Sequence, residues 1–266
     1  MVMDFQKQLA VVESIAHADC DIRMDCPFCT HSNTFIIKKN NSKLSWYCFH
    51  ASCNARGKHT GKLTMEDVQA TIENYDRSDE EMKRKRKSFS VPPQFTSILS
   101  NEKCIDYIRK NNCYDAYKKG KASFMYDPRQ NRIAFLIQDE DKNIRGAIGR
   151  GLNSKVYPKW YIYGEKETPF ICGDSDIAVL VEDCASACAV SEIHTGVALM
   201  GTSLPDSYIP ILKTKFRKVI VALDRDATTK SFAISNKLRY FIPSEVKILE
   251  DDLKYFEKEK IKEMFI

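Results

Sequence analysis

The sequence lacks any long apolar stretch. No run of about 18 apolar residues occurs, so no segment is long enough to cross a bilayer as a helix. The first 20 residues carry acidic side chains and contain no apolar core followed by a small-residue cleavage site, so they do not resemble a secretory signal peptide. We therefore expect a cytoplasmic protein with no membrane partner.

The composition of the chain is that of a folded, water-soluble protein. Apolar residues make up 43% of the chain, which allows a conventional buried core, and the 266 residues are enough for one large domain and a small one. The net charge of +5 is mildly basic. Such a charge is compatible with nucleic acid but does not diagnose it, so the distribution of charge along the chain carries more information than the sum.

Ten cysteines are many for a chain of this kind. The size, the absence of a signal peptide and the cysteine spacing all disfavour a secreted disulfide scaffold. Four of the cysteines cluster between residues 26 and 53. The others are scattered through ordinary patterned segments, and we interpret them as reduced structural thiols: Cys20, Cys104, Cys113, Cys172, Cys184 and Cys188.

The N-terminal part has the pattern of a small module. Residues 1–20 show the apolar spacing of an amphipathic helix. Residues 24–60 are dense in cysteine, aromatic and turn-forming residues, and their short extended runs at 34–38 and 44–47 predict a small β ribbon. A helix is expected to follow at 65–73.

A charged segment separates this module from the rest of the chain. Residues 76–93 read DRSDEEMKRKRKSFSVPP, with almost nothing to bury and two prolines at the end, which predicts a linker. Residues 83–87 within it are five consecutive basic residues. This run is either a solvated tether or an arm that contacts phosphates, and the two interpretations are compatible.

From residue 94 the pattern becomes that of a globular domain with two styles of sheet. A helical stretch at 101–110 precedes short strands separated by polar turns, which predicts a mixed α+β part: 122–126, 132–137 and 144–150. From residue 177 continuous apolar runs alternate with helical segments, with strands at 177–181, 197–200, 219–223 and 246–249 and helices at 185–193, 207–215 and 227–240. Continuous apolar strands between helices indicate a parallel sheet covered on both faces.

The clustered cysteines have the spacing of a metal site. Cys26-Pro-Phe-Cys29 and Cys48-Phe-His-Ala-Ser-Cys53 form two close pairs on opposite sides of the predicted ribbon. Zinc takes four soft ligands at tetrahedral corners, and a ribbon this small has too little core to fold without a metal. The spacing therefore predicts a structural zinc site with these four ligands, in which His50 competes with Cys53.

Aromatic and cationic residues surround the cysteines. Single-stranded nucleic acid is bound by aromatic side chains that stack on bases and cations that contact phosphates. We interpret the group as a binding face, although Phe35 and Trp46 have the alternative of filling the core of the ribbon. The group comprises Phe28, His31, Phe35, Lys38, Lys39, Lys43, Trp46, Tyr47, Phe49, Arg56 and Lys58.

Carboxylates follow three of the predicted strands. Glu182 follows IAVLV, Asp224 and Asp226 follow VIVAL, and Asp252 lies in an acidic group after the last strand. The carboxyl ends of parallel strands meet at one edge of a sheet, so we expect these side chains to converge there. The period-two pleat would point Asp224 and Asp226 the same way. Converging oxygen ligands suit Mg²⁺, which completes its shell with water and substrate phosphates.

The order of these motifs resembles the TOPRIM fold shared by DnaG-type primases and topoisomerases. Over nearly its full length the chain is similar to the primases of podovirus-type bacteriophages, with four cysteines ahead of a charged linker. The stretches NRIAFLI, IRGAIGRGL and YPKW resemble elements that precede TOPRIM in bacterial primases, LMGTSL resembles a Gly-Thr turn inside that fold, and Asp252-Leu-Lys254 resembles the last acidic motif. Asp183 departs from the pattern, because most family members have glycine after the first glutamate.

The resemblance implies a multi-domain protein of the α/β and α+β classes. It divides the chain into a zinc-ribbon domain at 1–75, a charged linker at 76–93, a mixed α+β basic subdomain of the primase core at 94–172, and a Rossmann-like TOPRIM catalytic subdomain at 173–266. If the chain is viral, the implied location is the cytoplasm of the infected bacterial host.

The activity implied by the resemblance is that of a DNA primase, a DNA-directed RNA polymerase. Such a nucleotidyltransferase joins nucleoside triphosphates on single-stranded DNA into short RNA primers for phage-type replication. The implied catalytic residues are Glu182, Asp224 and Asp226, which with help from Asp252 hold a pair of Mg²⁺ ions that stabilise charge on the attacking and leaving oxygens. The structural zinc is the other implied metal.

Three cations ahead of the TOPRIM part are expected to contact template and triphosphate: Arg132, Arg150 and Lys159. We expect no helicase within this sequence, because its nearest match to a phosphate loop, the Gly-Lys stretch at 57–64, has one residue too few between its glycines for a Walker A loop. We therefore expect a separate replicative helicase and a DNA polymerase as partners in a primosome.

Two rival functions share the TOPRIM fold. A RecR-like DNA clamp of recombination also pairs zinc with TOPRIM but places them next to each other, whereas here the whole stretch 54–181 lies between Cys53 and Glu182. A TOPRIM nuclease would use the same metals for hydrolysis. Assays for nucleotide incorporation and for DNA cleavage separate these possibilities.

Overall fold

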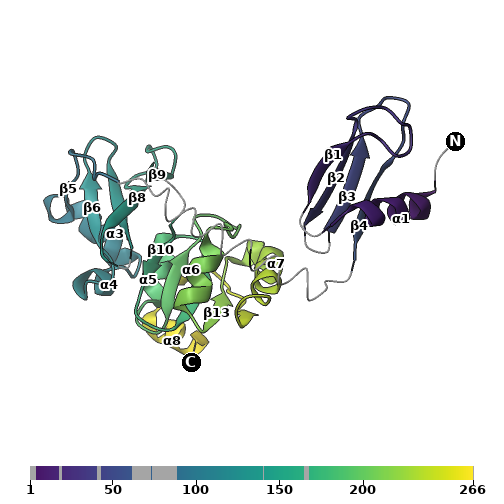
Figure 1. Cartoon of the computed structure of the whole chain (residues 1–266). Helices are drawn as coiled ribbons and strands as arrows, with labels where there is room; N and C mark the ends of the chain where they lie inside the picture. The colour runs from purple at the N-terminus through teal and green to yellow at the C-terminus, as the bar shows by residue number, and fades with distance from the viewer. Residues whose placement is uncertain are drawn as a thin grey trace. The chain divides into compact units, whose positions relative to one another are not determined.

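The computed structural model describes residues 4–17, 20–40, 43–61, 73, 89–139, 141–164 and 168–265. The chain divides into two compact units, Met1–Glu80 and Glu81–Ile266, coloured purple to blue and teal to yellow in Figure 1. The boundary between the units falls inside the linker expected at 76–93. Most of that linker, its basic run and nearly all of the helix expected at 65–73 lie outside the described residues.

Among the described residues, no helix combines the length and the apolar character that crossing a membrane requires.

The first unit is an antiparallel sheet with a helix packed on it. The helix is α1 (Phe5–Ile15), and Asp4 caps it by accepting a hydrogen bond from the N–H of Gln6. The described strands pair in the order β1-β2-β3-β4, with β1 (Asp21–Met24), β2 (Phe35–Asn40), β3 (Lys43–Cys48) and β4 (Arg56–Thr60). The predicted ribbon is confirmed in β2 and β3, whereas β1 and β4 were not predicted as separate strands.

The core of the first unit is small. Leu9 and Val12 of α1 pack against Phe35, Ile37 and Trp46 of the sheet, together with Cys26 and Cys48. The indole N–H of Trp46 donates to the Gln8 side chain at 3.0 Å, so the polar atom of the buried ring is satisfied. Two of the metal-site cysteines belong to this core, so the folding of the unit and the formation of the metal site depend on each other.

The second unit begins with an antiparallel sheet. Its strands pair in the order β5-β6-β7-β8-β9, with β5 (Thr96–Ser97), β6 (Phe124–Asp127), β7 (Arg132–Gln138), β8 (Ile144–Gly151) and β9 (Trp160–Gly164). The short 3-10 helix η1 (Ile98–Ser100) leads into α3 (Glu102–Lys110) and α4 (Tyr114–Lys118). The mixed α+β character predicted here is confirmed.

The second unit continues with a largely parallel sheet in the order β10-β12-β11-β13-β14. Its strands are β10 (Phe170–Cys172), β11 (Ile177–Val181), β12 (Thr195–Ala198), β13 (Lys218–Val221) and β14 (Ser244–Val246). Strand β11 runs parallel to β12 and β13, and β13 runs parallel to β14, whereas β10 is antiparallel to β12. The predicted parallel pairing is therefore confirmed, with an antiparallel edge strand added.

The helices of this sheet alternate with its strands. They are α5 (Cys184–Val190), α6 (Tyr208–Lys215), α7 (Thr228–Leu238) and α8 (Lys258–Phe265), with the 3-10 helices η2 (Arg225–Ala227) and η3 (Leu253–Tyr255). Strands β11, β13 and β14 are neighbours in the sheet and run in one direction, so the segments that follow them emerge at the same edge.

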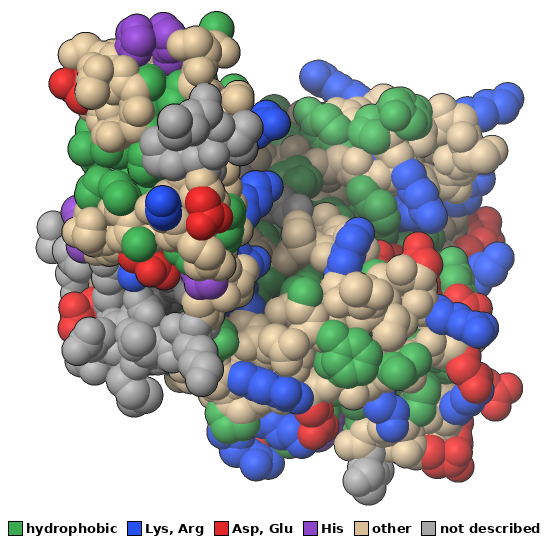
Figure 2. All heavy atoms as spheres, turned by 90° about the vertical axis from the view of Figure 1, so that its right-hand side faces the viewer, with side chains coloured by type: hydrophobic (Ala, Val, Ile, Leu, Met, Phe, Trp, Pro, Cys, Tyr) green, Lys and Arg blue, Asp and Glu red, His purple; other side chains and the backbone are tan. Residues whose placement is uncertain are grey.

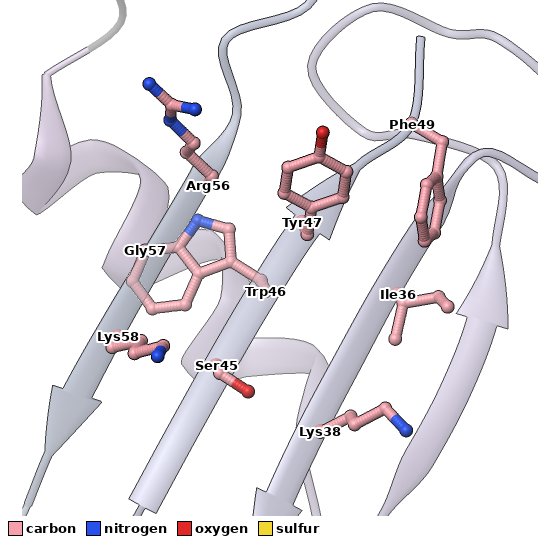
Figure 3. A pocket seen from close by; sticks show the side chains of 9 residues that line it. All are labelled: Ile36, Lys38, Ser45, Trp46, Tyr47, Phe49, Arg56, Gly57 and Lys58. Atoms are coloured by element: carbon pink, nitrogen blue, oxygen red, sulfur yellow. The ribbon is translucent and has the colours of Figure 1, made fainter.

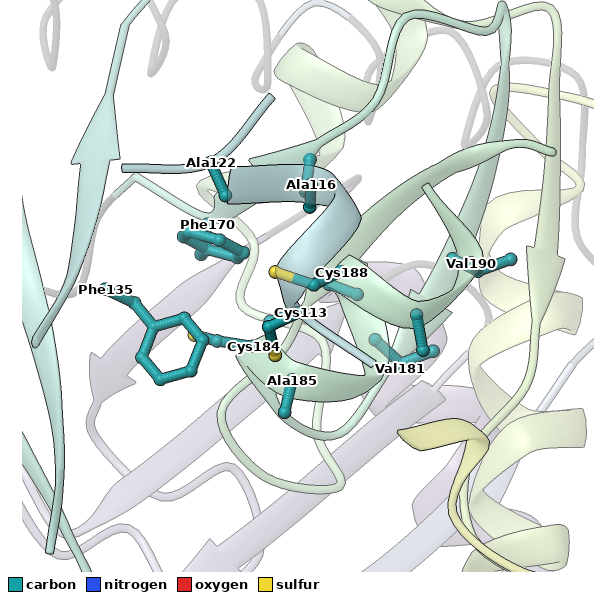
Figure 4. Close-up of a cluster of buried hydrophobic side chains, with 14 of the residues drawn as sticks. Cys113, Ala116, Ala122, Phe135, Phe170, Val181, Cys184, Ala185, Cys188 and Val190 are labelled. Carbon is teal, nitrogen blue, oxygen red and sulfur yellow. The ribbon is translucent and has the colours of Figure 1, made fainter. Parts of the chain in front are cut away.

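One continuous core joins the two sheets of the second unit. Phe135 of β7 packs against Phe170 of β10 at a ring-centroid distance of 5.6 Å, and both belong to the same buried cluster as Val181 and Ala185. Figure 4 shows this cluster around α5. The antiparallel and parallel parts therefore share a core, which fixes their relative placement.

The six cysteines outside the metal spacing are buried free thiols, as predicted. Cys113, Cys172, Cys184 and Cys188 lie in the shared core of the second unit. Burial raises the pKa of Cys184 and Cys188 well above the ordinary thiol value, so these groups stay protonated and apolar in character.

Candidate functional site

The four clustered cysteines form a closed sulfur cage. The Sγ atoms of Cys26 and Cys53 are 3.9 Å apart, those of Cys29 and Cys48 are 3.7 Å apart, and all four lie within 4.8 Å of one another. Zn–S bonds of about 2.3 Å in a tetrahedron place the sulfurs about 3.8 Å apart. The cage therefore fits a zinc ion in both distance and ligand type.

Two tight turns present these sulfurs. After Cys26, the N–H of Thr30 donates to the Cys26 carbonyl at 2.8 Å, and Thr30 has a positive φ of 59°. On the facing turn, the N–H of Cys53 donates to the His50 carbonyl at 2.9 Å. Each pair is thus held by backbone hydrogen bonds that close its loop, which is why close cysteine spacing produces convergent sulfurs.

His50 lies beside the cage with a partner that sequence reasoning missed. The rings of His31 and His50 stack with centroids 3.4 Å apart, and a ligand atom of each lies within 4.8 Å of the Cys29 sulfur. The Nδ1 of His50 is hydrogen-bonded to Ser52 at 2.9 Å, and its backbone N–H donates to the Cys48 sulfur at 3.5 Å. Cys53 completes the four-sulfur set, and His50 borders it.

The thiols of the cage differ in acidity. Burial acts to raise the pKa of Cys48, but hydrogen bonds, led by the one from the His50 N–H, outweigh it and lower that pKa to about 7. Burial raises the pKa of Cys26 to about 12. One thiol of the set therefore ionises readily near neutral pH, which favours capture of a metal ion.

The open face of the first sheet carries the aromatic and cationic residues. Side chains that alternate along three strands point to this face, and they line a shallow pocket of about 470 Å³. Figure 3 shows the pocket, whose open-face residues are Ile36, Lys38, Ser45, Tyr47, Phe49, Arg56 and Lys58.

The register explains the order of these side chains. Tyr47 pairs with Ile36 on one side and Arg56 on the other, and Ser45 pairs with Lys38 and Lys58 in the same way. The row Ile36–Tyr47–Arg56 therefore lies beside the row Lys38–Ser45–Lys58, so cations flank the Tyr47 ring.

Two aromatic rings remain exposed on this face. Tyr47 and Phe49 are 46% and 56% exposed, and their rings meet edge to face at 4.9 Å. Arg23 lies over the Phe49 ring at 5.6 Å. Exposed rings beside cations match the needs of single-stranded nucleic acid, whose bases stack and whose phosphates need positive charge.

The alternative for Phe35 and Trp46 is confirmed, because both are core residues with 0% and 2% exposure. Gly57 on β4 is required by the Trp46 ring, since a Cβ at Gly57 would lie 2.2 Å from a ring atom. Of these four predicted aromatic residues, Tyr47 and Phe49 are therefore available on the binding face, whereas Phe35 and Trp46 are not.

The carboxylates of the second unit gather at one edge of the parallel sheet. Glu182 follows β11 directly, and its carboxylate accepts a hydrogen bond from the backbone N–H of Asp224. Asp224 and Asp252 are joined by a side-chain hydrogen bond, although 27 residues separate them in the chain. The backbone carbonyl of Glu182 also accepts from Gly201 in the turn after β12 at 3.3 Å. We call Glu182, Asp224, Asp226 and Asp252 the acidic centre.

The period-two argument for a common direction of Asp224 and Asp226 does not apply in the structure. Strand β13 ends at Val221, and Asp224 is the N-cap of the 3-10 helix η2, so neither aspartate lies on a strand. Asp224 is half-buried and Asp226 is exposed. Asp226 still lies close enough for its charge to raise the pKa of Glu182.

Protons are unevenly shared in the acidic centre. Burial, helped by the hydrogen bond with Asp252 and the charge of Glu182, raises the pKa of Asp224 to about 8. Burial also acts to raise the pKa of Asp252, but its bonds to Asp224 and Lys254 outweigh this and lower it. Without a cation, the pair therefore holds a proton on Asp224 near neutral pH.

The acidic centre fits a hydrated magnesium ion. Glu182 has a buried Oε1 with no hydrogen-bond partner, and burial followed by the charges of its acidic neighbours raises its pKa, so its negative form calls for a cation. Across the described part of the chain, three or more ligand atoms within 4.8 Å of one another occur only in the first unit. No three ligand atoms of the acidic centre lie that close together, so a cation bound there would keep several water ligands, as Mg²⁺ does.

Lys254 completes the acidic centre; the sequence placed it in the motif Asp252-Leu-Lys254 but gave it no role of its own. Its Nζ bonds to Asp183 Oδ2 at 2.6 Å and also to Asp252, and the side chain is 8% exposed. Burial acts to lower the pKa of Lys254, but the charge of Asp183 and its bond, followed by those of Asp252, raise it to about 12. A lysine within an acidic loop was the signal available in the sequence.

A basic pocket of about 710 Å³ adjoins the acidic centre. Arg150 and Lys159 both line it, as the sequence suggested, and the charge of Lys159 lowers the pKa of Asp252. The Nε of Arg150 is buried without a hydrogen-bond partner, and its guanidinium lies over the Trp160 ring at 5.0 Å. A positive pocket therefore borders the carboxylates.

Helix α3 supplies further lining to this pocket. Lys103, Tyr107 and Lys110 recur at helical spacing, so they fall on one face of α3, and all three line the pocket. Burial raises the pKa of Tyr107 well above its ordinary value, so its hydroxyl stays protonated. The 3.6-residue periodicity of α3 was the signal that could have identified these residues.

Arg132 does not line the basic pocket, contrary to expectation. Its side chain is 1% exposed, and its Nη1 donates to the backbone carbonyls of Gly149 and Lys159 at 3.5 Å. Its Nε donates to Gln130 at 3.1 Å, and its guanidinium lies over the Tyr161 ring. Because a buried arginine needs such partners, Arg132 joins β7 to the neighbouring strands and is unavailable to phosphate in this conformation.

Charge on the surface is dispersed. On the face shown in Figure 2, lysine and arginine side chains are spread over the view with acidic side chains among them. The net charge of +5 therefore says less than the local pairing of a basic pocket with an acidic centre.

Comparison with known proteins gives solved primases as structural neighbours. The zinc-binding and RNA polymerase domains of the Aquifex aeolicus primase align with 97% of this chain and 82% of their own, at 17% identity and a TM-score of 0.45. The E. coli primase catalytic core aligns with 74% and 73%, at 18% identity and 0.45. A DnaG primase catalytic domain bound to ssDNA aligns with 75% and 72%, also at 18% identity and 0.45.

No family model and no curated protein sequence matches the chain. Since the structural neighbours share less than a fifth of their residues with it, the function of the chain rests on its own residues.

Proposed function

We propose that the chain is a DNA primase of the DnaG type that synthesises short RNA primers on single-stranded DNA. The observation that carries the proposal is the acidic centre at one sheet edge beside a basic pocket of about 710 Å³. Phosphoryl chemistry on nucleotides needs this pairing, because a cation-binding carboxylate set handles the reacting phosphate while nearby cations bind the rest of the polyanion.

The acidic centre is proposed to bind the reacting groups. Glu182 and Asp224 would hold Mg²⁺, with Asp226 and Asp252 as further oxygen donors. When bound, the ion supplies positive charge to the attacking 3′-hydroxyl and to the α-phosphate of the incoming nucleotide. Binding of a cation by the Asp224–Asp252 pair would release to solvent the proton that the pair otherwise holds.

The basic pocket is proposed to bind the triphosphate and the nearby template. Arg150 and Lys159 provide charge on the side facing Asp252, and Lys103 and Lys110 provide it from α3. Tyr107 offers a neutral hydroxyl donor. Arg132 acts indirectly in this proposal, since it holds the backbone of Gly149 and Lys159 in place.

The open face of the first unit is proposed to hold the template. Tyr47 and Phe49 would stack on bases, and Lys38, Arg56 and Lys58 would contact phosphates. The zinc ion held by the four cysteines would keep this face folded and take no part in the chemistry.

The finer parts of the proposal follow from the sequence resemblance. We assign residues 1–75 to the zinc-binding domain, 76–93 to the linker, 94–172 to the basic subdomain and 173–266 to a TOPRIM subdomain. A bacteriophage origin, and a separate replicative helicase and DNA polymerase as partners, complete the assignment.

A synthesis assay tests the proposal and separates it from its rivals. The zinc-loaded chain is incubated with Mg²⁺, labelled nucleoside triphosphates and a random library of single-stranded DNA, and the products are sequenced. A primase yields short, template-dependent RNA. Cleaved DNA without incorporation would instead identify a nuclease, and DNA binding with neither product would identify a clamp.

A further inference from the structure

The ammonium group of Lys254 lies among the carboxylates of the acidic centre, where the second Mg²⁺ ion of a two-metal site would be expected. Its ammonium bonds to Asp183 and Asp252, which come from the turns after β11 and β14, and its side chain is 8% exposed. A buried carboxylate requires a cation, either a metal ion or a basic side chain. Lys254 meets this requirement for two carboxylates at once.

Both carboxylate oxygens of Asp183 already accept a hydrogen bond. Its Oδ1 accepts the N–H of Ser186 at 2.9 Å and so caps α5, while its Oδ2 accepts from Lys254 at 2.6 Å. The side chain is 12% exposed. Asp183 is therefore committed to the helix cap and to Lys254.

Asp252 is held from several sides. Lys254 bonds to its Oδ2, Asp224 shares a hydrogen bond with it, and the charge of Lys159 also reaches it. The loop that carries it is fixed as well, because Asn112 donates to the backbone carbonyls of Lys254 and Phe256 at 3.1 and 2.8 Å. Asp252 is thus placed before any metal ion binds.

Glu182 and Asp224 are the members of the centre that still need a cation. The buried Oε1 of Glu182 has no hydrogen-bond partner, and the half-buried Asp224 has Asp252, another carboxyl group, as its side-chain partner. Two-metal centres hold their ions about 4 Å apart. An ammonium fixed on Asp252 would repel a second divalent ion at that distance.

We propose that the Lys254 ammonium stands in for one divalent cation, so that the acidic centre binds a single divalent ion through Glu182 and Asp224. Lys254 is a positioning residue in this scheme, because it acts through Asp252. The inference rests on the proposed function and narrows it from a pair of metal ions to one ion and a lysine.

The test counts Mn²⁺ ions bound to the full, zinc-loaded chain. Free Mn²⁺ is followed by its electron paramagnetic resonance signal during titration, and zinc content is measured in the same samples so that the sulfur cage is not counted. We expect one Mn²⁺ per wild-type chain at the acidic centre, and loss of this binding in Glu182→Gln.

Variants of the lysine decide the inference. The double variant Asp183→Asn with Lys254→Met removes one negative and one positive charge and keeps a residue able to cap α5. We expect it to gain a second bound Mn²⁺, whereas Lys254→Arg keeps one. Lys258→Met, four residues after Lys254, removes an exposed lysine that pairs with Asp115 and is the matched control, with an unchanged Mn²⁺ count.

The number of Mn²⁺ ions bound by wild type and by the double variant decides whether the inference holds. Two Mn²⁺ per wild-type chain would overturn it whatever the variants do, and so would a folded double variant that still binds one ion with unchanged affinity. If the double variant does not fold, one Mn²⁺ per chain in wild type and Lys254→Arg supports it. Primer synthesis with two bound ions would refute only the role of Lys254, whereas one bound ion without synthesis would refute only the proposed function.

Discussion

The two units of the chain differ in the residues that they offer to a divalent metal ion and in where those residues lie in the fold. In the first unit the ligands are sulfurs on tight turns, and Cys26 and Cys48 are part of a small core. In the second unit the ligands are oxygens that follow strand ends, at the rim of a core that is complete without them. In our proposal, the metal ion of the first unit is part of its fold, whereas the metal ion of the second unit takes part in the reaction.

The cysteines show the same contrast. Cys48 sits on a turn where hydrogen bonds lower its pKa to about 7, while burial raises the pKa of Cys184 far above the ordinary value. The residue type is identical, and the local backbone decides whether a thiol is a ligand or a small apolar side chain.

The largest expected effect is on the sulfur cage. Cys29→Ser should release zinc and unfold the first unit, because structural zinc sites contribute about 10 kcal/mol or more to folding. The second unit should keep its thermal transition. Zinc release by a chromogenic chelator and a calorimetric scan measure both, and Cys188→Ser is the control that keeps zinc. A first unit that stays folded without zinc would break the comparison.

The next effect concerns the open face of the first unit. Phe49→Ala and Tyr47→Ala should each weaken binding of single-stranded DNA by about 1–3 kcal/mol, because each removes a stacking platform. Fluorescence anisotropy with a labelled oligonucleotide measures the change at fixed salt. Tyr240→Ala, which removes an exposed ring of the second unit, is the control. Equal affinity in all three variants would remove the template role from this face.

A packing change sharpens the comparison. Gly57→Ala should destabilise the first unit by about 1–3 kcal/mol, because the new Cβ would lie 2.2 Å from the Trp46 ring. Gly120→Ala in the second unit is the control for backbone strain without a steric clash, since the φ of Gly120 is +69° and a Cβ there meets nothing within 4 Å. Chemical denaturation followed by tryptophan fluorescence reports the change. A stable Gly57→Ala variant would contradict the close contact.

The smallest effect is a pH dependence of the second unit without divalent ions. Folding raises the pKa of Asp224 from 3.8 to about 8, so the folded state holds a proton that the unfolded chain releases in this range, and stability should fall as pH rises between these values. The lowered pKa of Asp252 opposes part of this loss. Asp224→Asn should flatten the curve and stabilise the unit near pH 8 by about 1 kcal/mol after solvent screening. An identical pH profile in wild type and variant would exclude proton storage at Asp224.

Much of the architecture could be predicted from periodicity and spacing. The continuous apolar runs at 177–181 and 219–223 predicted parallel strands, and β11 and β13 are parallel. The shortest strands were not predicted, because β5 and β10 have two and three residues, too few for a periodic signal. Helix α4 was missed for the same reason.

The site was predicted less completely than the fold. Spacing along the chain predicted the sulfur cage, because its turns are local. The buried state of Arg132 and the pairing of Lys254 with Asp183 depend on contacts between segments far apart in sequence, and no local pattern encodes them. The period-two argument for Asp224 and Asp226 assumed a longer strand, whereas β13 ends three residues before Asp224.

Dinucleotide synthesis by three proteins tests the central claim most directly. Wild type, Glu182→Gln and Asp224→Asn are incubated with Mg²⁺, labelled triphosphates and single-stranded DNA, and their folding and DNA affinity are checked in parallel. The account predicts synthesis by wild type and a loss of about 10³-fold or more in both variants, with fold and DNA binding retained. Undiminished synthesis by either variant would contradict it.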